Sequence, residues 1–136
     1  MSLLLVRHAS AGNREDWTDH DHERPLDARG LEQAAQLPEV LSRFPIERIL
    51  SSPAKRCVQT VEPIAAARGL TVEPREELSE DRRQADDGAA LVRSLAGQNV
   101  LVCGHGGLES VIPGAPKWRK GTTFVVDDNL HVESIF

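Results

Sequence analysis

Two histidines in this sequence come directly after short apolar runs. His8, preceded by Arg7, follows residues 3–6, and His105 follows residues 100–103. Neither run alternates between apolar and polar residues, which is typical of a strand buried on both faces of a parallel sheet. Open α/β sheets bind their ligands beyond the carboxyl ends of such strands. We therefore expect both imidazoles at one ligand-binding edge.

Two further groups are expected at the same edge. Arg56 lies near the start of the helix that follows the second predicted strand, and Glu80 lies in the loop after the third. An arginine offers a planar fork of donors that matches phosphate oxygens. Gly106, beside His105, leaves backbone N–H groups accessible to an anion. Histidine is a nucleophile that divides one difficult displacement into two easier steps, so these residue types indicate phosphoryl transfer.

The elements that must position these groups alternate along the chain. Strands are predicted over residues 47–50, 70–73 and 99–103 as well as 3–6, helices over 28–41, 53–68, 88–96 and 108–112, and a closing strand pair over 122–126 and 131–135. Asp27 is the expected N-cap of the first helix, whose apolar residues we expect on one face from Leu31 to Leu41. Pro38 is expected to kink or divide it. Pro53 is expected in the first turn of the second helix, and Gly69 is expected to end that helix.

This order predicts an α/β fold with a mostly parallel sheet, and an antiparallel addition from the last strand pair. Because the chain has 136 residues, we expect one domain, 1–136. Its 16 basic and 21 acidic residues give a net charge of −5, which argues against a nucleic-acid partner or an anionic membrane surface. Cys57 and Cys103 are expected to be reduced packing residues. Without a membrane-length apolar run or a signal peptide, we expect a cytoplasmic monomer.

The motifs resemble those of the histidine phosphatase superfamily, also called the phosphoglycerate-mutase-like family. Residues 7–9, Arg-His-Ala, resemble its Arg-His-Gly signature, and the small phosphohistidine phosphatases of the SixA type often carry alanine there. Residues 51–60 resemble its second motif, with the arginine at Arg56, and residues 104–106 resemble its second histidine motif. Residues 24–30 resemble the SixA branch. The resemblance extends from residue 3 to about residue 107.

The resemblance implies a three-layer sandwich with helices on both faces of the sheet, and it implies a role for each site residue. His8 would be phosphorylated during turnover. Arg7, Arg56 and His105 would bind the phosphoryl oxygens, with the backbone at Gly106 beside them.

The resemblance also implies an acidic residue that protonates the leaving group. Residues 78–80, Leu-Ser-Glu, resemble the family's Leu-x-Glu pattern, so Glu80 is the predicted acid and Glu77 the second candidate. The short segment after His105, interrupted by Pro113, leaves little room for the lid segments of larger members. We therefore expect an open site.

Two substrate classes remain open at this point, a phosphorylated protein and a small phosphorylated metabolite. The SixA-like motifs favour protein phosphohistidine, whose leaving imidazole needs little help. Glu80 favours a phosphate ester or a nucleotide, because a poorer leaving group gains more from a general acid.

Two other classes of function compete with a histidine phosphatase. Residues 19–23, Asp-His-Asp-His-Glu, could combine with His8 into the site of a metal-dependent hydrolase. This segment has no helical His-x-x-x-His spacing, so we expect a solvated loop, with no metal and no cofactor. Alternatively, the same cations could serve a phosphate- or phosphoprotein-binding module without turnover.

Overall fold

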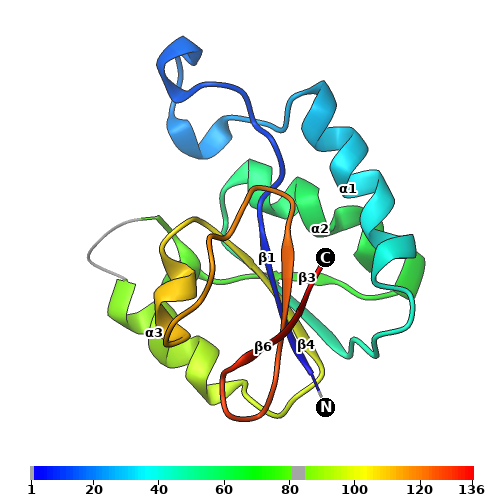
Figure 1. Ribbon diagram of the computed structural model, residues 1–136. Helices are drawn as coiled ribbons and strands as arrows, with labels where there is room; N and C mark the ends of the chain where they lie inside the picture. The colour runs from blue at the N-terminus through cyan, green and yellow to red at the C-terminus, as the bar shows by residue number, and fades with distance from the viewer. Residues whose placement is uncertain (1, 81–84) are drawn as a thin grey trace.

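The fold is a six-stranded sheet with helices on both faces (Figure 1). The computed structural model describes residues 2–80 and 85–136. The strands follow the order β3-β2-β4-β1-β5-β6, in which β3, β2, β4 and β1 run parallel and β5 and β6 are antiparallel additions. Their bounds are β1 Leu3–Arg7, β2 Arg48–Ser51, β3 Val72–Pro74, β4 Val100–Gly104, β5 Thr123–Val126 and β6 Val132–Ile135. The predicted fold class and strand pattern are confirmed.

Alternate residues of the central strands enter two separate cores, as the apolar runs predict. Leu4 and Val6 of β1 pack with helices α1 (Ala28–Val40) and α2 (Lys55–Arg68). Leu3 and Leu5 face the opposite side, where they share a core with helix α3 (Ala85–Ser94) and Trp118. Because strands buried on both faces need apolar residues at every position, the run without alternation follows directly from this layering.

The N-terminus of α1 and the C-terminus of α2 agree with the predicted signals, but the buried face of α1 differs from the prediction. The side chain of Asp27 caps α1 by accepting from the N–H of Gly30, and Gly69 ends α2 with a φ of 65°. Leu31 and Val40 are exposed, so the prediction that they belong to the buried face of α1 is wrong. The buried residues of α1 are Gly30, Ala34 and Leu37.

The two prolines also act differently from the prediction. Pro38 neither divides nor ends α1, which continues to Val40. It lies in the last turn, where the loss of one N–H removes a single hydrogen bond and little helix follows that a kink could redirect. Pro53 precedes α2, which begins at Lys55 with Ala54 as its N-cap.

Strand register brings the ends of three strands level with one another. Arg7 of β1 lies opposite Gly104 of β4, and Ser51 of β2 lies opposite Cys103. The backbone N–H of His8 continues the ladder by donating to the carbonyl of Gly104 at 3.1 Å. The residues that follow these strands therefore meet at a single edge of the sheet.

The connection from β1 to α1 lies beyond this edge. It carries the short 3-10 helices η1 (Arg14–Asp16) and η2 (Asp21–Glu23), drawn in blue at the top of Figure 1. A third, η3 (Glu76–Leu78), follows β3, and a fourth, η5 (Leu108–Val111), follows β4. Within residues 2–80 and 85–136, no helix is long and apolar enough to cross a membrane.

Gly30 sets how closely α1 approaches the end of β1. A Cβ atom there would lie 1.9 Å from the backbone carbonyl oxygen of Ser10, which also accepts from the N–H of Asp27. Alanine normally stabilises a helix relative to glycine. We expect the opposite here, with Gly30→Ala lowering the free energy of unfolding by about 1–3 kcal/mol, the usual range for overpacking.

Urea denaturation measures this difference. Gln36→Ala, at an exposed position of the same helix, is the control and should change little. A Gly30→Ala variant as stable as the wild type would show that Ser10 does not constrain the helix.

Candidate active site

His8 is held in a fixed orientation at the end of β1. Its imidazole is 4% exposed, and its Nδ1 lies 2.8 Å from the carbonyl oxygen of Ala9, to which an Nδ1–H donates. The N–H of Ala9 in turn donates to Thr60 Oγ1 on α2 at 3.0 Å. With the proton on Nδ1, the lone pair of the ring lies on Nε2.

The pKa of His8 is lowered to about 3. Burial is the largest cause, the hydrogen bond to Ala9 acts in the opposite direction, and electrostatic repulsion from His105, Arg56 and Arg7 adds to the lowering. The imidazole is therefore neutral at physiological pH, and a neutral imidazole is the nucleophilic form.

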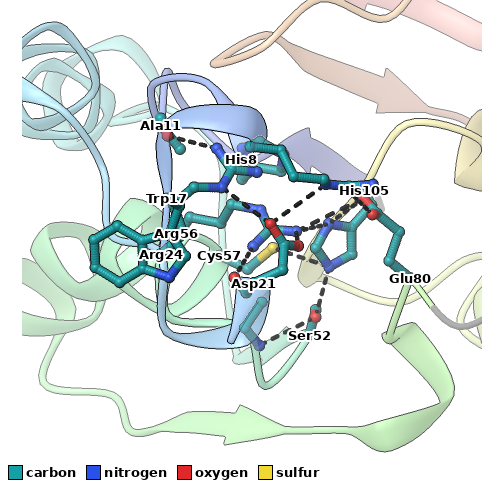
Figure 2. Close-up of polar contacts among 12 residues, drawn as sticks. His8, Ala11, Trp17, Asp21, Arg24, Ser52, Arg56, Cys57, Glu80 and His105 are labelled. Atoms are coloured by element: carbon teal, nitrogen blue, oxygen red, sulfur yellow. Dashed lines mark hydrogen bonds and ion pairs between the residues drawn. The ribbon is translucent and has the colours of Figure 1, made fainter. Parts of the chain in front are cut away.

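His105 packs edge-on against His8, with 5.5 Å between the ring centroids. Its Nε2 lies 2.8 Å from Ser52 Oγ and 3.6 Å from Cys57 Sγ. Its Nδ1 lies 3.2 Å from Glu80 Oε2, so this nitrogen carries the proton that the carboxylate accepts. Both ring nitrogens are thus fixed by neighbouring side chains, and Figure 2 draws these contacts.

Each of two arginines at the site has a buried donor without a partner. The guanidinium of Arg56 is 1% exposed, and Arg7 donates from NH1 to the carbonyl oxygen of Trp118 at 2.8 Å. Nε of both arginines is buried and finds no hydrogen-bond partner among the residues that the structure describes. A Cβ on Gly106 would lie 3.0 Å from the guanidinium of Arg7, so a glycine allows this arginine to pack against the loop.

Glu80 extends from the loop after η3 toward the histidines. Its carboxylate pairs with Arg14 and His105, and its Oε2 lies 3.7 Å from Arg56 NH2. Burial on its own raises its pKa, but the charges of His105, Arg14 and Arg56 and a hydrogen bond from Arg14 outweigh burial and lower the pKa. Glu77, the second candidate acid, is instead paired with Arg75 at 2.8 Å.

The sequence predicted that five of these side chains meet at one edge of the sheet, namely Arg7, His8, Arg56, Glu80 and His105. It did not predict that two further side chains reach the site. Arg14 and Asp21 come from η1 and η2, and both reach the site. Asp21 belongs to the acidic and histidine-rich segment that suggested a metal site. In the structure its carboxylate contacts the guanidinium groups of Arg14, Arg24 and Arg56.

The other members of that segment lie apart from the site. His20 and His22 are exposed. Among the described residues, no three His, Cys, Asp or Glu side chains are grouped so that they could hold a metal ion. Cys57 and Cys103 are free thiols, as predicted, and both are fully buried.

Two adjoining hollows open at this edge, and Arg14 and Glu80 line both of them. The hollow over His8 has a volume of about 410 Å³, and arginine and lysine side chains make up half of its lining residues. Its other lining residues are Arg7, His8, Gly12, Asn13, Arg24 and Lys120. The hollow beside His105 has a volume of about 450 Å³ and a mixed lining, with the apolar residues Leu78, Ala89 and Leu108 next to Ser79 and Ser110.

Comparison with known sequences identifies the family. Residues 3–89 match the sequence model of the Histidine phosphatase superfamily (branch 1), and this span contains Arg7, His8, Arg56 and Glu80. The chain belongs to this superfamily. An 8-oxo-(d)GTP phosphatase from Mycolicibacterium smegmatis is 34% identical over 143 residues, a match that covers 92% of this chain and 44% of that protein. This chain thus spans less than half the length of that relative.

Solved structures confirm the expected fold. The protein histidine phosphatase SixA, complexed with tungstate, superposes with a TM-score of 0.78 at 23% identity, covering 100% of this chain and 96% of that one. The α-ribazole phosphatase from Shigella flexneri superposes with a TM-score of 0.73 at 21% identity, covering 93% of this chain and 90% of that one. The chain therefore has the phosphoglycerate-mutase-like fold that its motifs implied.

The burial of a neutral His8 makes stability depend on pH. Unfolded, His8 binds a proton below its ordinary pKa of 6.5, whereas folded it stays neutral until about pH 3. The unfolded state thus gains protons first, and stability falls as the pH drops through 6.5. We expect the free energy of unfolding to fall by about 2 kcal/mol more in the wild type than in His8→Asn between pH 7 and pH 5.

Urea denaturation at the two pH values measures this difference. The control is His22→Asn, which changes an exposed histidine and should keep the dependence of the wild type. If His8→Asn loses as much stability as the wild type, then His8 is protonated in the folded protein.

Proposed function

We propose that this protein is a phosphatase that forms a phosphohistidine intermediate on His8. The observation that carries the proposal is a pair of buried Nε donors, on Arg7 and Arg56, that have no partner within residues 2–80 and 85–136 and belong to the same site as a neutral imidazole. A buried donor without a partner is costly, and a phosphoryl group supplies acceptors of matching geometry and charge. The site thus combines a nucleophile with donors suited to a phosphoryl group.

In the first step, His8 Nε2 attacks phosphorus and the bond from phosphorus to the leaving oxygen breaks. Arg7, Arg56, His105 and the backbone of Gly106 bind the phosphoryl oxygens, and Glu80 gives its proton to the leaving oxygen. In the second step, water attacks phosphorus and the phosphorus–nitrogen bond breaks. Glu80 takes the proton from this water. Cleavage of the phosphorus–nitrogen bond returns His8 to its neutral form and releases phosphate.

Glu80 must hold a proton for the first step, although its pKa is lowered in the free protein. The pKa is lowered by His105 and Arg56, which would bind the phosphoryl group, and by Arg14, which lines both hollows beside Glu80. A dianionic phosphoryl group neutralises those cations and adds a like charge close to the carboxylate, and both changes raise the pKa. Substrate binding would therefore favour the protonated form of Glu80, which the first step requires.

The covalent intermediate can be tested directly. Protein denatured at alkaline pH during its reaction with a ³²P-labelled aryl phosphate should carry a base-stable, acid-labile label on His8. His8→Asn should remain folded and lose label and nearly all turnover, whereas His22→Asn should keep both.

Label on His105 would contradict the assignment of the nucleophile. Phosphate binding with neither label nor turnover on any substrate would instead favour a binding module without catalysis.

The geometry favours a small phosphorylated compound as the substrate. The hollow beside His105 adjoins Glu80, and its volume and partly apolar lining suit an organic leaving group that enters the protein. Glu80 is placed beside both hollows, where a leaving oxygen would lie between them. The similarity to an 8-oxo-(d)GTP phosphatase supports a small substrate of this kind, for which a nucleotide is one candidate.

Protein phosphohistidine is the second candidate, as for a SixA-type phosphatase, and the ionised state of Glu80 favours it. A leaving imidazole needs less protonation than an alkoxide, so a carboxylate without its proton would not prevent this reaction. The hollow over His8 is also open enough for a side chain presented by another protein.

The leaving group distinguishes the two substrate classes. We expect Glu80→Gln to lower kcat for an alkyl phosphate by about 10²–10⁴-fold, the usual contribution of a general acid. Nitrophenyl phosphate, whose leaving group is a stable anion, should be affected much less, and a phosphohistidine peptide least. The measurement is kcat/KM for the three substrates with the wild type and the variant.

Glu76→Gln, an exposed neighbour, is the control and should change none of the three rates. Glu77→Gln tests the second candidate acid and should have little effect. Equal losses on all three substrates with Glu80→Gln would mean that Glu80 acts through binding. No loss on any of them would exclude Glu80 as the acid and favour phosphohistidine.

A further inference from the structure

Asp21 binds the buried guanidinium of Arg56 at one end. NH1 of Arg56 donates to the backbone carbonyl oxygen of Asp21 at 2.8 Å, and NH2 donates to Asp21 Oδ2 at 3.0 Å. The arginine is 1% exposed, whereas the Asp21 side chain is 35% exposed. A residue on the β1–α1 connection therefore holds both terminal nitrogens of a cation that lies on α2.

This contact leaves a different edge of the guanidinium available. An arginine has five N–H donors, which it can present in pairs either from NH1 and NH2 or from Nε and NH2. Asp21 takes the first pair. Nε is the donor without a partner among the described residues, and NH2 lies 3.4 Å from His105 Nδ1. The edge formed by Nε and NH2 is therefore the one that Asp21 does not bind, and its NH2 lies beside His105.

Asp21 is itself fixed by two other arginines. Its Oδ1 lies 3.1 Å from Arg24 Nε and 3.3 Å from Arg14 Nε. Arg24 is 7% exposed and also donates from NH1 to the carbonyl oxygen of Ala11. Through Arg24, the Asp21 carboxylate that binds Arg56 is also linked to the backbone of the β1–α1 connection, as Figure 2 shows.

We propose that Asp21 is a positioning residue that presents the Nε–NH2 edge of Arg56 to the phosphoryl group. It acts on the substrate only through Arg56, and the inference rests on the proposed function. The carboxylate also lowers the energy of a buried cation, which would otherwise lack a counter-charge at that end. Without it, the guanidinium loses the contacts that set its orientation, and a misplaced donor weakens binding in the transition state most.

A competing interpretation makes opposite predictions. If Asp21 occupied the donors that the phosphoryl group needs, it would act as an anionic plug, and its removal would strengthen anion binding. Asp21 does not bind Nε, which has no hydrogen-bond partner among the described residues, and this favours positioning. Measurement of phosphate affinity decides between the two, because it changes in opposite directions.

The experiment compares Asp21→Asn with Glu23→Gln, an exposed acid in the same 3-10 helix. Calorimetric titration with inorganic phosphate gives the dissociation constant, and turnover of nitrophenyl phosphate gives kcat and KM. We expect Asp21→Asn to weaken phosphate binding about tenfold and to lower kcat by about 10–10²-fold, with a smaller change in KM. Glu23→Gln should change neither. Asp21→Ala, which removes the carboxylate without adding a donor, should behave as Asp21→Asn does.

A double-mutant cycle separates positioning from a merely structural role. Lysine has no fork to orient, so Asp21→Asn should cost little more in an Arg56→Lys background. Equal losses in both backgrounds would mean that Asp21 only supports the fold of its connection, and tighter phosphate binding by Asp21→Asn would identify a plug. Either result overturns the proposal, as would a wild type that binds no phosphate at millimolar concentration.

Failure of the proposed function would look different. In that case the wild type would turn over no phosphorylated substrate, yet it would still bind phosphate, and the coupling between Asp21 and Arg56 would still appear in the dissociation constants. Conversely, an Asp21→Asn variant with wild-type kcat and phosphate affinity would reject positioning and leave the phosphatase activity intact.

Discussion

The parallel register of β1, β4 and β2 is the constraint on which the rest of this structure depends. It sets Arg7 opposite Gly104 and Ser51 opposite Cys103, so the chain leaves all three strands at the same level. His8 and His105 follow directly, and their rings come to lie 5.5 Å apart. A histidine pair far apart in the sequence thus becomes a rigid unit because the strands before it are buried on both faces.

Much of this could be predicted from the sequence, because the signals were local. The apolar runs before His8 and His105 indicated buried strands, and Asp27 and Gly69 marked helix ends. The positions of the site residues followed once the sheet was taken as parallel. The error at Leu31 and Val40 has a physical cause, because the close approach of α1 at Gly30 sets which face of the helix is buried. Gly30, Ala34 and Leu37 lie on that face, whereas Leu31 and Val40 do not.

The contacts of Asp21 and Arg14 could not be predicted, because they depend on how a connection without periodicity lies over the sheet. Charged residues in such a segment are usually solvated, and nothing in their spacing distinguishes Asp21 from its neighbours Asp19 and Glu23. Only the three-dimensional arrangement shows that Asp21 faces three arginines. The acidic segment is better understood as a source of one counter-ion than as a set of metal ligands.

The burial of Arg56 links conformational stability to the chemistry of the site. Its charge is balanced by carboxylates from two different connections, Asp21 before α1 and Glu80 after η3. Both connections are thus tethered to α2 by the same cation, and substitutions that remove it would loosen two surface segments at once. The side chain at this position therefore serves both folding and anion recognition, and a stabilising substitution elsewhere could not restore both properties.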